Sequence, residues 1–79
     1  MKLTAMSNEV FEYVKNNGGK VSIEELTNVT GRTARSVGAN VTDLKKKGLA
    51  ERVKEKVDDK DITYVVLTDD GVNFVPSED

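Results

Sequence analysis

The stretch Val21–Leu49, VSIEELTNVTGRTARSVGANVTDLKKKGL, decides how this chain folds. Near its start, Ser22 and Glu25 have the spacing of a capping box, in which each side chain satisfies a backbone donor that the first helical turn leaves unpaired. Thr30-Gly31 then interrupts the pattern, because glycine readily takes the left-handed conformation that ends a helix. The stretch therefore predicts a helix over residues 23–29 that ends in a tight turn.

A second helix is predicted over residues 34–47, with Thr33 as its N-terminal cap. Val37, Val41 and Leu44 recur along one face at helical spacing, and a glycine follows where such a helix would end. Two helices joined by a tight turn have the proportions of a helix-turn-helix. The second helix of that motif is the one that enters the major groove of DNA.

A further helix is predicted ahead of this motif, over residues 5–16. Thr4 can cap its start, and the run Asn17-Gly18-Gly19 can end it. Lys20-Val21 then forms a very short strand. The apolar stripe of the first helix is Met6, Val10, Tyr13 and Val14, with Phe11 at its edge, and the inward positions of the next are Ile23, Leu26 and Val29.

Beyond residue 48 the hydrophobic period changes from that of a helix to that of a strand. Residues 49–57 and 62–67 predict the two strands of a hairpin, joined by a polar turn over 58–61. In the first strand, Val53 and Val57 lie on one side, and the other side carries Arg52, Lys54 and Lys56.

The C-terminal segment is predicted to return to the core. Thr68–Gly71 opens a short turn or helix that carries Val72 and either Phe74 or Val75 inward. Pro76 stops this element, and residues 77–79 are expected to fray.

Composition limits the classes of function. The chain has 79 residues, so we expect one domain over 1–79, and 37% apolar with 33% charged residues suits a folded one. It contains neither cysteine nor histidine, so thiolate ligands and the commonest general base are excluded. The sequence also has no glycine-rich phosphate loop and no pattern of an activated nucleophile. We therefore expect no enzyme, no metal, no cofactor and no recognisable small-molecule ligand.

Localisation is predicted from hydropathy. The longest apolar run, Tyr64–Leu67, is far too short for a membrane span or for the core of a signal peptide. We therefore expect a cytoplasmic protein with no membrane partner.

Charge is unevenly distributed along the chain. The net charge is −2, yet residues 32–56 hold eight basic and three acidic residues, against four basic and eleven acidic elsewhere. Such separation can present one positive face to phosphates while the remainder stays negative. The alternative is that these charges only solvate ordinary surface elements.

The order of these pieces resembles that of winged-helix proteins and is most similar to MarR-like and related bacterial and phage regulators. The resemblance rests on Ser22-Ile23-Glu24-Glu25-Leu26, Thr30-Gly31-Arg32-Thr33, Leu44–Leu49 and Leu67-Thr68-Asp69-Asp70-Gly71. It implies an α+β winged helix-turn-helix fold, with three helices followed by a hairpin wing and a short C-terminal turn or helix. It also implies a transcriptional regulator or accessory factor that binds double-stranded DNA.

The sequence departs from that family in two ways. Its wing turn, Asp58-Asp59-Lys60-Asp61, is acidic, and phosphates would repel it. The terminal helices through which MarR-like regulators dimerise have no counterpart in this sequence. A lone domain usually needs a second copy or a partner to reach useful specificity, so a homodimer stays an open possibility. The alternative function is a winged helix that binds a protein of the transcription or replication machinery.

The candidate DNA-binding residues come from the second helix of the motif and from the basic strand. Arg35 is the best candidate for a base edge, because a guanidinium matches the two acceptors of guanine. Ser36 and Ala39 are also expected to face bases, while Thr33 and Ser36 can donate to phosphate. The full set is Arg32, Thr33, Arg35, Ser36, Ala39, Thr42, Lys46, Arg52, Lys54 and Lys56.

Several positions keep two interpretations. Gly38 permits either a close approach to DNA or tight packing of a neighbouring element against the helix. Asn40 is a structural hydrogen-bonding residue or a base reader. Lys45–Lys47 either favour the helix dipole or contact phosphate. Tyr64 and Val66 are either covered by the C-terminal segment or left as a partner surface.

Overall fold

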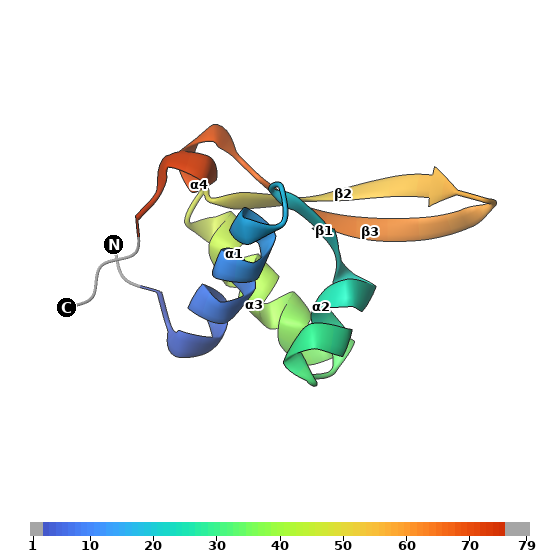
Figure 1. The fold of residues 1–79 in the computed structure, drawn as a ribbon, viewed down its shortest axis with the longest axis horizontal. Helices are drawn as coiled ribbons and strands as arrows, with labels where there is room; N and C mark the ends of the chain where they lie inside the picture. The colour runs from blue at the N-terminus through green and yellow to red at the C-terminus, as the bar shows by residue number, and fades with distance from the viewer. Residues whose placement is uncertain (1–2, 76–79) are drawn as a thin grey trace.

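A computed structural model describes residues 3–75 (Figure 1). The elements are α1 (Ala5–Asn16), β1 (Lys20–Ser22), α2 (Ile23–Thr30), α3 (Ala34–Lys46), β2 (Ala50–Val57), β3 (Lys60–Leu67) and α4 (Asp69–Asn73). The strands form an antiparallel sheet in the order β1–β3–β2. The β2–β3 hairpin projects past α2 as a wing (Figure 1). Within the described part of the chain, no helix combines the length and apolar character needed to cross a membrane.

Each helix begins where the sequence places a cap. The cap hydroxyl accepts a hydrogen bond from the backbone N–H three residues on, and the caps are Thr4, Ser22, Thr33 and Thr68. The capping box at Ser22 is only half formed, because the Glu25 carboxylate instead accepts from the Tyr13 hydroxyl at 2.5 Å. This hydrogen bond raises the pKa of Tyr13, since it holds the phenol in its protonated form.

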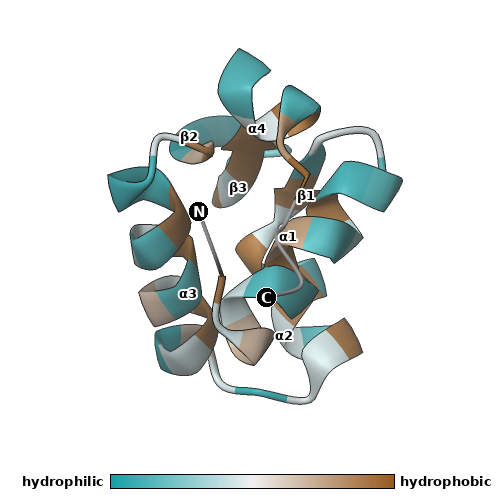
Figure 2. Ribbon diagram, turned by 90° about the vertical axis from the view of Figure 1, so that its left-hand side faces the viewer, coloured by the Kyte–Doolittle hydropathy of each residue, from teal (hydrophilic) through white to brown (hydrophobic). Residues whose placement is uncertain are grey.

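The predicted valine–leucine face of α3 is confirmed. Val37, Val41 and Leu44 are fully buried, and Figure 2 shows the hydrophobic sides of α1 and α3 turned toward the interior. Phe11 is also fully buried, where its ring packs edge-on against Phe74 with centroids 5.5 Å apart. The prediction that placed Phe11 at the edge of its stripe was therefore wrong, and of the two C-terminal residues proposed to pack inward it is Phe74 that does so.

Three other residues predicted to face inward are exposed. The buried stripe of α1 runs through positions 7, 10, 11 and 14, so Ser7 occupies the place predicted for Met6, which is 55% exposed. In α2 the half-buried Thr30 follows Leu26 by one helical turn, and Val29 points outward. Val72 is also exposed, on the outer side of α4. Pro76 and residues 77–79 lie outside the described residues.

Ser7 is buried because Asp43 of α3 accepts its hydrogen bond. The Ser7 hydroxyl donates to one carboxylate oxygen at 2.9 Å, and the ammonium of Lys47 donates to the same oxygen at 2.9 Å. The bond from Lys47, with a smaller contribution from Ser7, lowers the pKa of Asp43 against the opposing effect of partial burial. The cluster therefore ties α1 to the end of α3 through an ionised carboxylate.

We expect this cluster to stabilise the fold only while Asp43 is ionised. Because the pKa is lowered in the folded state, its contribution is present above the unfolded value of about 3.9 and is lost as pH falls through the folded value. The side chain is 35% exposed, so we expect Asp43→Asn to cost only about 1 kcal/mol at neutral pH.

Urea unfolding of both proteins between pH 7 and pH 2.5 measures this difference, which should shrink toward zero at the acidic end. The matched control is Asp70→Asn, an exposed aspartate in α4. A difference that stays constant with pH would contradict the proposed role of the charge.

The wing is longer than the sequence predicted. Val57 pairs with Lys60, so the turn has only Asp58 and Asp59 at its centre, and Lys60 and Asp61 belong to β3. Both central residues have positive φ, 51° and 65°, as a two-residue hairpin turn that matches the strand twist requires. The predicted four-residue turn over 58–61 was therefore wrong. Its signal was missed because aspartate, unlike glycine, seldom takes two such conformations in succession.

Replacing Asp58-Asp59 with Asn-Gly should stabilise the wing. Asparagine and glycine take positive φ at lower cost than aspartate, so we expect the free energy of unfolding to rise by roughly 1 kcal/mol. Thermal unfolding at low protein concentration measures the change. An unchanged or lower stability would show that the turn is not strained in the way its dihedral angles indicate.

The two faces of the wing differ in chemistry. Residues directly opposite each other in an antiparallel pair share a face, and Arg52 lies opposite the buried Val65. The face that packs on the helices near the root of the wing therefore carries Arg52, and further out it carries Lys54 and Lys56. This confirms the predicted separation of the basic side chains from the valines of the same strand.

The other face of the sheet mixes apolar with charged side chains and is only partly covered. Tyr64 lies opposite Val53, which is exposed, and next to the half-buried Val66. The ammonium of Lys20 lies 4.7 Å from the centre of the Tyr64 ring and pairs with Glu55 at 2.6 Å. Tyr64 is therefore covered by a cation from β1.

Candidate nucleic-acid interface

The outward side of α3 is held in place by the turn that precedes it. Gly31 ends α2 with φ at 70°, and Thr33 then caps α3 by accepting from the N–H of Ser36 at 3.1 Å. The predicted outward residues of α3 divide into exposed ones, Arg35, Ala39 and Lys46, and half-buried ones, Ser36 and Thr42. Arg35 therefore lies in the first turn, where a helix that enters a groove meets the bases.

Arg52 connects the wing to α3. Its guanidinium donates to the backbone carbonyl of Gly38 at 2.7 Å and to the hydroxyl of Thr42 at 2.8 Å. A Cβ at Gly38 would lie 3.7 Å from this guanidinium, in ordinary contact. The hairpin therefore contacts the helix at Gly38, but a Cβ would fit there, so this packing does not require a glycine. Only the glycine inside the helix signalled this contact in the sequence.

The basic face of the wing and the outward side of α3 adjoin each other at this contact. Lys54 and Lys56 extend the face beyond Arg52, and both are exposed. Lys56 lies directly across from Asp61 on the same face, so the negative charge of Asp61 partly cancels the positive potential of Lys56. Lys54 lies across from the uncharged Thr63. Lys54 therefore presents the stronger positive charge on the wing.

Most of the basic side chains on this surface have no acidic partner. Among residues 3–75, the salt bridges join Lys20 to Glu55, Arg32 to Glu9 and Lys47 to Asp43. The predicted site residues without such a bridge within those residues are therefore Arg35, Lys46, Arg52, Lys54 and Lys56. We call this set, together with Thr33, the basic surface.

Arg32 is placed differently from the other predicted site residues. Its guanidinium donates to Asn40 of α3, and to Glu9 of α1 at 2.9 Å, and its side chain is only 16% exposed. A third, longer bond reaches the carbonyl of Met6 at 3.4 Å. Arg32 thus joins α1 to α3, and its donors are already used inside the molecule. Asn40, the acceptor on α3, has the structural role that was one of its two interpretations.

The arrangement of helices and wing has a counterpart among solved structures. A transcriptional regulator homologue from Pyrococcus horikoshii OT3 superposes with a TM-score of 0.75 at 19% sequence identity, over 85% of this chain and 65% of that one. This chain has a winged-helix fold. It spans less than two thirds of the regulator homologue. Comparisons with protein families and with curated proteins found no match.

Proposed function

We propose that this winged-helix chain binds double-stranded DNA and acts as a transcriptional regulator or accessory factor. The observation that supports this most is the contact of Arg52 with α3, which brings the exposed side of the helix and the basic face of the wing onto one surface. Uncompensated cations on a shared surface attract the phosphate backbone of a duplex.

In the proposed complex, the N-terminal half of α3 enters the major groove. Arg35 meets a base edge there, with guanine as the matching partner, while Ala39 and Ser36 pack beside it. The hydroxyl of Thr33 accepts from the helix and keeps its own proton, which it donates to a phosphate.

The wing and the end of α3 bind the phosphate backbone in this proposal. Lys54 makes the principal wing contact, Lys56 a weaker one beside Asp61, and Lys46 contacts phosphate from the end of α3. Arg52 and Thr42 hold wing and helix together next to the DNA. We leave Arg32 out of the contacting set, because its donors serve Asn40 and Glu9.

A titration of mixed-sequence duplexes by fluorescence anisotropy tests the proposal. The three lysine–phosphate contacts predict a slope of log K against log salt of about −2.7, with non-specific Kd values of roughly 1 to 100 µM near physiological salt. Absence of binding at tens of micromolar protein in low salt would contradict the proposal. Light scattering of the complex reports whether one or two copies bind, since two half-sites need two copies.

A further inference from the structure

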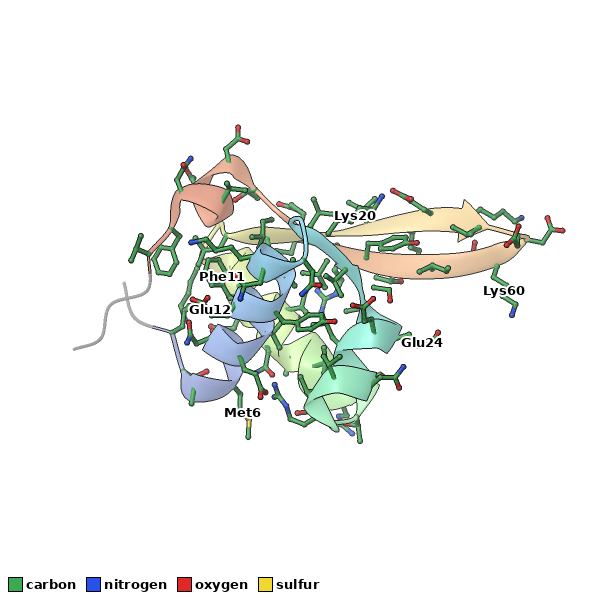
Figure 3. The ribbon with its side chains drawn as sticks, viewed as in Figure 1. Met6, Phe11, Glu12, Lys20, Glu24 and Lys60 are labelled. Atoms are coloured by element: carbon green, nitrogen blue, oxygen red, sulfur yellow. The ribbon has the colours of Figure 1, made fainter. Side chains whose placement is uncertain are left out.

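A groove opens beside the wing, between β3 and the starts of α2 and α3. Its volume is about 330 Å³, and it is lined by Ile23, Glu24, Ala34, Gly38, Arg52, Asp61, Ile62 and Thr63. Figure 3 shows Glu24 at the start of α2, beneath the wing, and Lys60 at the outer end of β3. The volume is at the lower end of the range of about 300–1,000 Å³ for small-ligand sites.

The groove lies under the helix-facing side of the wing and reaches the edge of β3. Three consecutive residues of β3, Asp61 to Thr63, line it, although successive side chains of a strand point to opposite faces. Arg52, Asp61 and Thr63 share the helix-facing side of the wing, so the groove lies under that face and reaches the edge of β3 at Ile62. Along that edge β1 ends at Ser22, opposite Tyr64, and the chain turns away into α2. Residues 60–63 consequently pair only with β2 among the described residues, and their other edge is left unpaired.

The lining selects a cationic, partly apolar occupant. Ile23 and Ile62 supply half-buried apolar surface, and the exposed carboxylates of Glu24 and Asp61 form no salt bridge within residues 3–75. The positive charge of Arg52 is directed to α3, where its guanidinium is hydrogen-bonded. The two carboxylates repel phosphate, so the groove, which adjoins the basic surface at Arg52, differs from it in charge.

We propose that this groove binds an extended peptide of a partner protein by strand addition to β3. The peptide backbone pairs with the unpaired edge of residues 60–63, which gives a strand of about four residues or 13 Å. An apolar side chain of the peptide contacts Ile23 and Ile62, and a lysine or arginine lies between Glu24 and Asp61. This site goes beyond the proposed DNA binding, and neither depends on the other.

Titration of the ¹⁵N-labelled chain with two synthetic peptides tests the site. One is an acetylated hexapeptide of alternating valine and lysine, and the other alternates valine and glutamate. We expect the lysine peptide to shift the amide resonances of residues 60–63 and of the start of α2, and to slow hydrogen exchange at the unpaired edge. The glutamate peptide should leave these resonances in place.

A charge-matched pair of variants separates the groove from general attraction. Glu24→Gln with Asp61→Asn should weaken binding of the lysine peptide by about fivefold to tenfold. Glu51→Gln with Asp70→Asn, which makes the same change in net charge on exposed residues outside the groove, should leave it unchanged.

Equal binding of both peptides, shifts confined to β2, or equal loss in both double variants would overturn the proposal. The proposal would also be overturned if light scattering showed that the chain self-associates and that this self-association explains the shifts in the amide resonances. DNA affinity of the same variants is measured in parallel. DNA affinity tests only the proposed role of the basic surface, and peptide binding tests only the groove. Either proposal can therefore be contradicted while the other stands.

Discussion

Replacing Gly71 with alanine is expected to lower the free energy of unfolding by about 3 kcal/mol, which corresponds to roughly 15 °C in Tm for a domain of this size. A Cβ at this position would lie 2.0 Å from the carbonyl oxygen of Leu49 and 3.3 Å from the Cβ of Leu67. The obstacle on the Leu49 side is backbone, which cannot move aside as a flexible side chain can.

The surrounding hydrogen bonds leave α4 little room to shift. The Thr68 hydroxyl donates to the carbonyl of Gly48 at 2.6 Å and accepts from the N–H of Gly71 at 3.0 Å. The N–H of Thr68 donates to the carbonyl of Leu49 at 3.0 Å. An alanine must therefore break part of this network or displace the start of β2.

Thermal and urea unfolding measure the effect, and Val72→Ala is the matched control because it removes an exposed side chain from the same helix. We expect the control to change stability by less than about 0.5 kcal/mol. If Gly71→Ala also changed the free energy of unfolding by less than about 0.5 kcal/mol, α4 would not approach the backbone of Leu49 this closely.

Reversing one charge on the wing should give the largest loss of DNA affinity. Lys54 lies on the face next to α3, across from an uncharged residue. We expect Lys54→Glu to weaken binding to mixed-sequence duplexes by roughly twentyfold at about 0.1 M salt, because a phosphate contact is lost and a repulsion is gained. The slope of log K against log salt should become shallower by about 1.

Lys60→Glu is the matched control. It makes the same change in net charge on an exposed residue of the wing, but strand alternation places Lys60 on the other face. We expect it to reduce affinity by no more than about threefold, through the long-range field alone. Equal losses in the two variants would mean that the wing attracts DNA only through its total charge. Unchanged affinity in Lys54→Glu would remove the wing from the interface.

Local signals in the sequence were sufficient to predict most of the fold. The run Asn17-Gly18-Gly19 and the caps Thr4 and Thr33 set helix boundaries through bonds within a few residues, so these boundaries could be read directly. The inward face of α1 could not be predicted fully from the sequence, because a serine is buried at a position where an apolar residue is expected. Ser7 is acceptable in the interior only because Asp43, distant in sequence, accepts its hydrogen bond.

The candidate site was predictable as a surface but not in its individual contacts. Exposed cations on α3 and on the wing follow from helix and strand periodicity. The role of Arg32 depends on Glu9 and Asn40 meeting at one guanidinium, and that requires α1 and α3 to be packed already. The close approach at Gly71 likewise involves a backbone carbonyl, about which residue types carry no information.

The two hydrogen bonds from Arg52 to α3 have a thermodynamic consequence for recognition. A wing that moved freely relative to α3 would lose conformational entropy when the protein bound a duplex, and this loss would weaken binding. In this chain the Arg52 guanidinium already holds the wing against α3, through the carbonyl of Gly38 and the hydroxyl of Thr42. In the proposed complex, α3 and the wing therefore meet the duplex already held together, which lowers the entropy lost on binding.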